Sequence, residues 1–155
     1  MSDLQTLLTE FAAGRLALLE RHEASARIVS NYDFNNTYQY VINREETHLS
    51  WLQSALAEYG AVLPAAGSAA LPAPHAPSIL DDDARYLGSF VVKWRPRVEP
   101  MTHARHRNML NVILGESMEH KRFFEQAAAG FEDLLGRRTG GVARVGGVLP
   151  TRWLE

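Results

Sequence analysis

The chain has 155 residues, of which 46% are hydrophobic and 22% charged, a composition typical of one globular domain with one hydrophobic core. A formal net charge of -2 argues against a broad positive surface for nucleic acid or anionic membrane, and the absence of cysteine excludes disulfides, thiolate metal sites and cysteine nucleophiles. Any bound metal must therefore be held by imidazole and carboxylate groups. Because of this net charge we expect no nucleic-acid partner. We expect a cytoplasmic protein with no membrane partner, because no apolar run of about 18 residues and no signal-peptide pattern is present.

Two helices are predicted in the first part of the chain. Apolar side chains recur at helical spacing from about Asp3 to Ser30, with Ser2 or Asp3 as the N-terminal cap. The same spacing returns from about Phe34 to Tyr59, after a short polar patch. Gly60 is expected to end this second helix.

A long connection, residues 60–78, follows and is rich in Pro, Ala and Gly. Such a segment cannot continue a helix and is expected to run extended over the surface. At roughly 3.1 Å per residue it can cover the roughly 39 Å length of a helix of about 26 residues, as a crossover along a bundle must. The alternative is a loose insertion between two helical pairs, since surface loops tolerate added length.

The second part of the chain also predicts two helices. One begins near Ser78 with acidic residues in its first turns, and Pro96 and Pro100 are expected to end it. The other is predicted over about Glu99 to Leu135, with Gly136 as its stop. Its expected inward face consists of Thr102, Met109, Val112, Ile113, Glu116, His120, Phe123, Ala127, Phe131 and Leu134. We therefore predict an all-α four-helix bundle over residues 1–135, followed by a Gly-rich basic tail, residues 136–155.

Each predicted helix carries potential metal ligands on or beside its apolar face. Burying an unpaired charge is costly, and a metal ion is one of the few groups that offsets the cost. The candidate ligands are His22 and Glu23 on the first helix, Glu45 and His48 on the second, Asp83 on the third, and Glu116 and His120 on the fourth. Acids and imidazoles on all four inward faces favour a shared metal site over four independent coincidences.

Each candidate also has a structural interpretation. A Glu-x-x-His pair on a helix is commonly solvated or helix-stabilising. Asp83 could instead belong to the acidic first turn of its helix, where the helix dipole favours it. His22 could instead be a hydrogen-bonded histidine of the core. Glu116 and His120 are also able to pair with Arg105, with Arg122 or with each other in a buried network.

At these residues the sequence resembles the ferritin-like superfamily, and the rubrerythrin-type di-iron carboxylate proteins in particular. The segment NREETHLSWLQSALAEYG resembles the second-helix motif of that family, with Glu45 and His48 as its Glu-x-x-His pair. The segment ILGESMEHKRFFEQAAAG resembles the fourth-helix motif, although Glu116 and His120 are four residues apart instead of three. Asp83 would supply the third-helix carboxylate. The first helix matches least, because the family carboxylate would be Glu20 or Glu23 whereas His22 falls on the apolar face.

The resemblance implies two iron or two manganese ions that react with oxygen or peroxide, as in ferroxidases and related oxidoreductases. Glu45 and Glu116 would bridge the ions, His48 and His120 would be terminal ligands, and Asp83 with Glu23 or His22 would complete the shell. It also implies a homo-oligomer. The departures from the motifs leave open a site with one metal or none.

Two other functions remain open. One is a metal-free interaction module that docks on a protein partner through its C-terminal tail, where Val148, Leu149, Trp153 and Leu154 follow a Gly-rich spacer. The other is a single zinc or nickel ion held by histidines such as His22, His103, His106 and His120.

Overall fold

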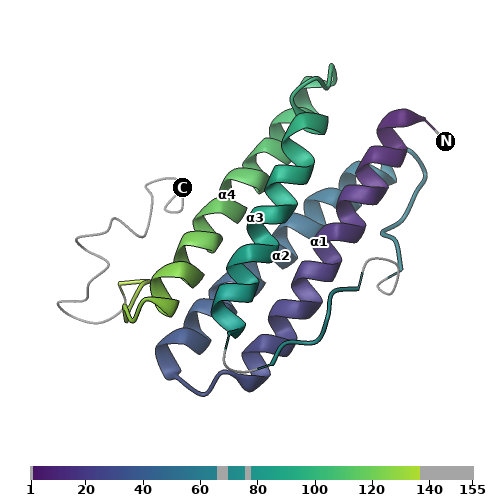
Figure 1. Cartoon of the computed structure of the whole chain (residues 1–155). Coiled ribbons are helices and arrows are strands. Elements are labelled where there is room, and N and C mark those ends of the chain that lie inside the picture. Colours follow the sequence, from purple (N-terminus) through teal and green to yellow (C-terminus); the bar gives the residue numbers. More distant parts are fainter. Residues whose placement is uncertain (1, 66–69, 76–77, 137–155) are drawn as a thin grey trace.

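The computed structural model describes residues 2–65, 70–75 and 78–136. These ranges contain four helices and no strand, namely α1 (Asp3–Ile28), α2 (Tyr32–Ala57), α3 (Ile79–Val98) and α4 (Ala104–Ala128), as Figure 1 shows. The predicted all-α bundle is therefore confirmed. Within the described ranges, no helix is both long and apolar enough to cross a membrane.

The bundle consists of two antiparallel helical hairpins packed side by side (Figure 1). The α1–α2 hairpin contacts the α3–α4 hairpin through α1 with α3 and through α2 with α4. Because α2 and α3 point the same way, the chain between them returns along the bundle, and its described parts run beside α1 in Figure 1. Leu63 and Leu71 of this connection pack against the core, and the Pro72 carbonyl accepts a hydrogen bond from Arg21 on α1.

Side-chain caps define where the first two helices begin. The Ser2 hydroxyl accepts a hydrogen bond from the Gln5 amide at 3.1 Å, and the Asn31 side chain accepts one from the Phe34 amide at 3.0 Å. Each cap satisfies an amide that has no partner within its helix. Asn31 thus starts α2 two residues before the predicted position. The helix ends at Ala57, and the turn that follows contains Gly60 with φ 72°.

The predicted ends of the last two helices were wrong. Pro96 lies inside α3, which continues to Val98 because a proline so close to the C-terminus removes only one hydrogen bond of the last turn. The other helix begins at Ala104, where His103 Nδ1 accepts from the His106 amide, and ends at Ala128 before Gly130, with φ 97°.

Three residues expected on the inward face of the fourth helix, Thr102, Val112 and Phe131, are exposed instead. Thr102 precedes the first residue of α4. Phe131 lies beyond the end of α4, so the helical spacing that placed it inward does not apply to it. Val112 lies within α4 but is turned away from the core.

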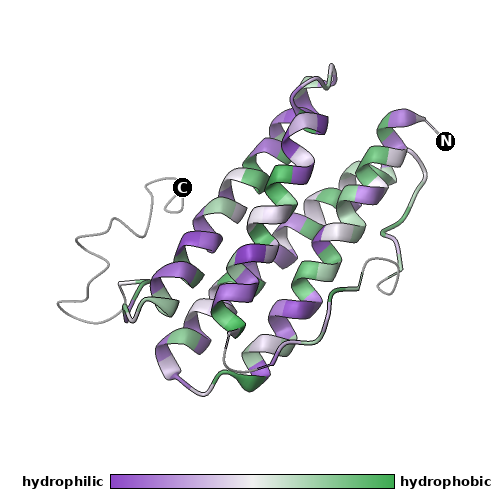
Figure 2. Cartoon of the chain, in the orientation of Figure 1, coloured by the Kyte–Doolittle hydropathy of each residue, from purple (hydrophilic) through white to green (hydrophobic). Residues whose placement is uncertain are grey.

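The apolar core is built by side chains from all four helices, and Figure 2 shows hydrophobic residues recurring along each of them. The close approach of α1 and α3 is set by Phe11, whose ring meets Phe90 and Trp94 edge-on at centroid distances of 5.1 and 5.0 Å. Gly14 makes room there, since a Cβ at this position would lie 2.9 Å from Cε2 of Phe90. Burial of these large aromatic surfaces stabilises the pairing of the two hairpins.

Candidate functional site

A cluster of polar side chains, here called the buried polar cluster, interrupts the apolar core between α1, α2 and α4. All of its members are at most 2% exposed. They are Arg15, His22, Glu45, His48, Glu116, Ser117 and His120. Five of the residues predicted from the apolar faces, His22, Glu45, His48, Glu116 and His120, therefore lie in one interior region.

His22 and Glu45 join α1 to α2 at the centre of the cluster. His22 Nδ1 lies 2.7 Å from Oε1 of Glu45, and it donates its proton to this carboxylate. In the neutral ring this hydrogen bond fixes the proton on Nδ1, so that Nε2 is the nitrogen with the lone pair. Nε2 is buried and has no hydrogen-bond partner in the described part of the chain. A carboxylate that orients an imidazole in this way is typical of histidines that bind metal through the opposite nitrogen.

Arg15 connects α1 to both other helices of the cluster. Its guanidinium donates to the Ser117 hydroxyl at 2.8 Å, to Oε2 of Glu45 at 3.4 Å and to Nδ1 of His48 at 3.3 Å. Burial lowers the pKa of Arg15, and the nearby carboxylates of Glu45 and Glu116 oppose this lowering. The guanidinium stays charged, as arginine does in proteins. Arg15 is not among the site residues predicted from the sequence, although it follows Phe11 by four residues and precedes His22 by seven, a spacing that places it on the same helical face.

His48 and Arg44 both donate to Glu116 and so join α2 to α4. Because Nδ1 of His48 accepts from Arg15, its proton is on Nε2, which donates to Oε1 of Glu116 at 2.8 Å. Arg44, at the edge of the cluster, binds the two oxygens of Glu116 at 3.0 and 3.1 Å. Burial raises the pKa of Glu116, but the hydrogen bonds from His48 and Arg44 outweigh it and bring the pKa below its usual value. Glu116 is therefore ionised.

His120 on α4 is the least satisfied member of the cluster. Neither of its ring nitrogens has a hydrogen-bond partner among the described residues. Its ring stacks on that of His48 at a centroid distance of 6.4 Å and meets the ring of Tyr40 edge-on at 6.1 Å. Burial, followed by the neighbouring His48 and Arg15, holds the pKa of His120 well below its ordinary value. The imidazole is therefore neutral and has lone-pair density to offer.

Asp83 lies in a different network, which ties α3 to α1 and α2. Its carboxylate accepts from Arg21 at 2.8 Å, from Ser25 at 2.7 Å and from the Tyr38 hydroxyl at 2.6 Å. Burial and the adjacent Asp83 raise the pKa of Tyr38, so this hydroxyl keeps its proton and donates it. Three donors satisfy the carboxylate of Asp83, which gives it a structural role in this geometry.

Glu23, the remaining candidate ligand, lies outside the cluster. It is half-buried and lines a surface hollow between α1 and α2 together with Arg27 and Glu46. The alternative histidine set is also divided, because His106 and His120 are 14 residues apart on α4, which corresponds to about 21 Å along the helix. His103 and His106 therefore cannot share an ion with His120.

The charges of the cluster are already balanced. Arg15 and Arg44 compensate Glu45 and Glu116, and no group of three or more His, Asp or Glu side chains in the described ranges is arranged to hold a metal ion. With Asp83 and Glu23 elsewhere, the cluster lacks the additional carboxylates that a two-ion centre shares. What it offers directly is the buried ring nitrogens of His22 and His120 that have no partner among the described residues.

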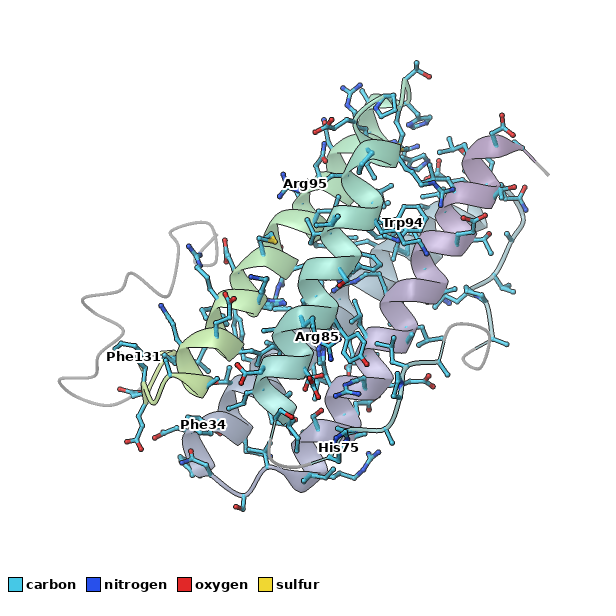
Figure 3. All side chains as sticks on the ribbon, viewed as in Figure 1. Phe34, His75, Arg85, Trp94, Arg95 and Phe131 are labelled. Atoms are coloured by element: carbon cyan, nitrogen blue, oxygen red, sulfur yellow. The ribbon has the colours of Figure 1, made fainter. Side chains whose placement is uncertain are left out.

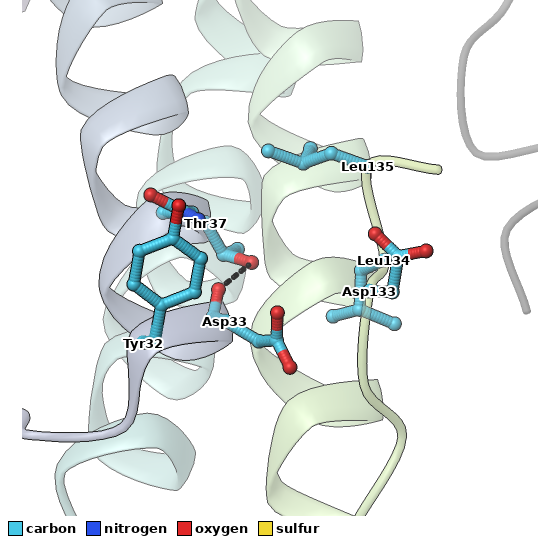
Figure 4. Close-up of a pocket in the computed structure, with 7 residues that line it drawn as sticks. Tyr32, Asp33, Thr37, Asp133, Leu134 and Leu135 are labelled. Carbon is cyan, nitrogen blue, oxygen red and sulfur yellow. Dashed lines mark hydrogen bonds between the residues drawn. The ribbon is translucent and has the colours of Figure 1, made fainter. Parts of the chain in front are cut away.

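A separate pocket of about 160 Å³ lies at the start of α2, where residues 133–135 pack against it (Figure 4). Asp33 and Asp133 face this pocket, and Thr37 donates within α2 to the backbone carbonyl of Asp33 at 3.1 Å. Asp33 precedes Glu45 by 12 residues, or about 18 Å along the helix. The pocket is therefore not an entrance to the buried polar cluster.

No protein-family model matches the chain, and comparisons with curated proteins and with solved structures give no significant match.

Proposed function

We propose that this chain is a ferritin-like metal-binding protein that holds a single divalent transition-metal ion, with iron as the first candidate, in the buried polar cluster. The observation that carries the proposal is the set of unpartnered nitrogens on two buried histidines, Nε2 of His22 and both ring nitrogens of His120. Buried polar atoms in native proteins nearly always have a partner, so such atoms call for a water molecule or an ion.

The two histidines are prepared for this role by their neighbours. Glu45 fixes the tautomer of His22 that presents Nε2, and the low pKa of His120 keeps its ring unprotonated, as a ligand must be. His48, Glu45 and Glu116 are further donors within the cluster, although each now has a hydrogen-bond partner. Imidazole favours iron, zinc, copper or nickel, whereas manganese prefers oxygen ligands, so the accessible donors favour iron over manganese.

Arg15 is the reason for proposing one ion instead of two. A di-metal centre uses the positive charge of a second ion to compensate its carboxylates. In this cluster the guanidinium of Arg15 lies against Glu45 and supplies that charge. The connection from α2 to α3, which returns along the bundle, supports the ferritin-like assignment because bundles of that type have one long crossover.

Bound iron would supply reactivity toward oxygen or peroxide, which is the ferroxidase or oxidoreductase chemistry of this class. The chain itself would exclude bulk water, since the cluster is at most 2% exposed. His22 and His120 would hold the ion, and Arg15 would hold the carboxylate of Glu45, which orients His22.

The test is metal titration of protein stripped with a chelator. We expect about one Fe²⁺ or Co²⁺ per chain, measured by elemental analysis after gel filtration, and a Co²⁺ absorption spectrum typical of nitrogen ligands. His120→Gln should abolish binding, whereas His103→Gln, the matched change at the other end of α4, should leave it intact. A wild-type protein that retains no ion, or two ions per chain, would contradict the single-ion proposal.

A second candidate function rests on the charge balance of the cluster. Because Arg15 and Arg44 already compensate both carboxylates, the bundle is also consistent with a metal-free interaction module whose His120 is hydrated by a buried water. The C-terminal tail that is predicted to bind this partner lies outside the described residues. Truncation after Gly136 tests this function, since loss of a bound partner with unchanged bundle stability would support it and unchanged association would contradict it.

A further inference from the structure

An apolar groove of about 740 Å³ lies on the outer face of α3 and α4. Val92, which is 75% exposed, and Met118, which is 37% exposed, are its protruding apolar side chains. Gly88 and Ser89 complete its α3 side with small residues. None of these residues belongs to the buried polar cluster, so the groove is independent of the proposed metal site.

Basic side chains surround the groove, and no acidic residue is among the described residues that line it. The four cations are Arg85, Lys93, Arg95 and Lys121, and Figure 3 shows Arg85 and Arg95 on α3. Arg85 pairs with Asp82 and Lys121 with Glu125 outside the groove. Lys93 lies over the ring of Trp94 at 5.7 Å, and the guanidinium of Arg95 makes no ion pair within the described ranges. The groove therefore carries a net positive charge.

Gly115 adds an observation from the adjacent surface of α4. It lies one turn before Met118, and a Cβ at this position would meet no described atom within 4 Å. A glycine inside a helix costs roughly 0.5–1 kcal/mol relative to alanine, and the interior of this bundle gives no reason for it. Glycines on a helix surface allow another backbone to approach closely.

We infer that this groove binds an acidic amphipathic helix of a partner protein. Two antiparallel helices offer a lengthwise groove that accepts a third helix, whose apolar residues at spacings of three and four would cover Val92 and Met118. Acidic residues beside this apolar stripe would pair with Lys93 and with Arg95, which makes no ion pair to any described residue. A second copy of the chain in a two-fold arrangement is disfavoured, because it would bring the cations of the two grooves together.

The experiment uses a synthetic helical peptide of about 18 residues, with leucines at spacings of three and four flanked by glutamates, and a scrambled peptide of the same composition. Fluorescence anisotropy should show micromolar binding of the first peptide, at least tenfold tighter than the scrambled one and weaker at high salt. Arg95→Glu and Val92→Ser should each weaken binding about tenfold. Arg27→Glu, the same charge reversal on the exposed face of α1, should leave it unchanged.

Three results would overturn the inference. Equal binding of the two peptides, or equal effects of Arg95→Glu and Arg27→Glu, would show that only overall charge matters. A wild-type dimer in analytical ultracentrifugation that Val92→Ser converts to a monomer would assign the groove to self-association instead. Circular dichroism of each variant establishes that the bundle is folded before binding is measured.

Discussion

Replacing Arg15 by methionine tests the electrostatic structure of the buried polar cluster. The change keeps most of the apolar stem but removes the donors to Ser117, Glu45 and His48. It leaves the carboxylate of Glu45 buried beside His22 without its compensating charge. Removing one partner of a buried ion pair typically costs about 3–5 kcal/mol, a large fraction of the roughly 5–15 kcal/mol by which a domain is stable.

The assay is urea unfolding of chelator-treated protein, followed by circular dichroism at 222 nm. The matched control is Arg105→Met, because Arg105 pairs with Glu58 at 2.6 Å but is 65% exposed, so its removal should change stability little. The double variant Arg15→Met, Glu45→Gln should recover part of the loss, because it no longer buries an unpaired charge. A loss in Arg15→Met no larger than that in Arg105→Met would refute the reasoning.

Three further predictions concern single side chains. Burial and Asp83 raise the pKa of Tyr38, so the folded protein keeps a proton that the unfolded chain releases above about pH 10. The free energy of unfolding should therefore fall by about 1.4 kcal/mol per pH unit above that pH. Urea unfolding at pH 9, 10 and 11 should show this loss in wild type and in Tyr32→Phe but not in Tyr38→Phe, and parallel curves for all three proteins would contradict it. Gly115→Ala should raise the melting temperature, since the site is open and alanine is favoured in a helix by up to about 1 kcal/mol. Gly14→Ala should lower the melting temperature because Phe90 must move. A higher melting temperature for Gly14→Ala than for Gly115→Ala would show that α1 and α3 do not approach this closely. Asp83→Asn should destabilise the protein, because Arg21 loses its buried partner, and should leave the metal content unchanged; loss of metal together with retained stability would instead make Asp83 a ligand.

The helical spacing of apolar residues was sufficient to predict the fold class, the four helices and the ends of the first two helices to within two residues. It failed where local chemistry overrides periodicity. His103 caps α4 and so starts it later than the prolines suggested, and Gly130 follows its early end. Helical spacing extended past that end wrongly predicts that Phe131 is buried.

The candidate site was predictable as a list of residues but not as an arrangement. Helical faces correctly placed His22, Glu45, His48, Glu116 and His120 in the interior. Periodicity along one helix, however, does not give the height at which two helices meet. Asp83 therefore appeared to be a partner of Glu45, although the structure pairs it with Arg21 in a separate network.

Arg15 escaped prediction for a different reason. Arginine on an apolar stripe is usually interpreted as a long side chain that reaches solvent, and only the tertiary structure shows that it is completely buried. Its charge determines how the surrounding acids and histidines are satisfied, so the interpretation of the whole site depends on a residue whose own signal in the sequence is weak.

The buried polar cluster also determines how the helices are aligned along the bundle. An all-leucine interface tolerates a slide of one helical turn, about 5.4 Å, because one leucine replaces another. The same slide of α4 would carry Glu116 away from both His48 and Arg44 and would leave its carboxylate buried without a donor. Only one alignment of the two hairpins satisfies these groups together. The polar residues of the buried cluster therefore also specify how the helices pack.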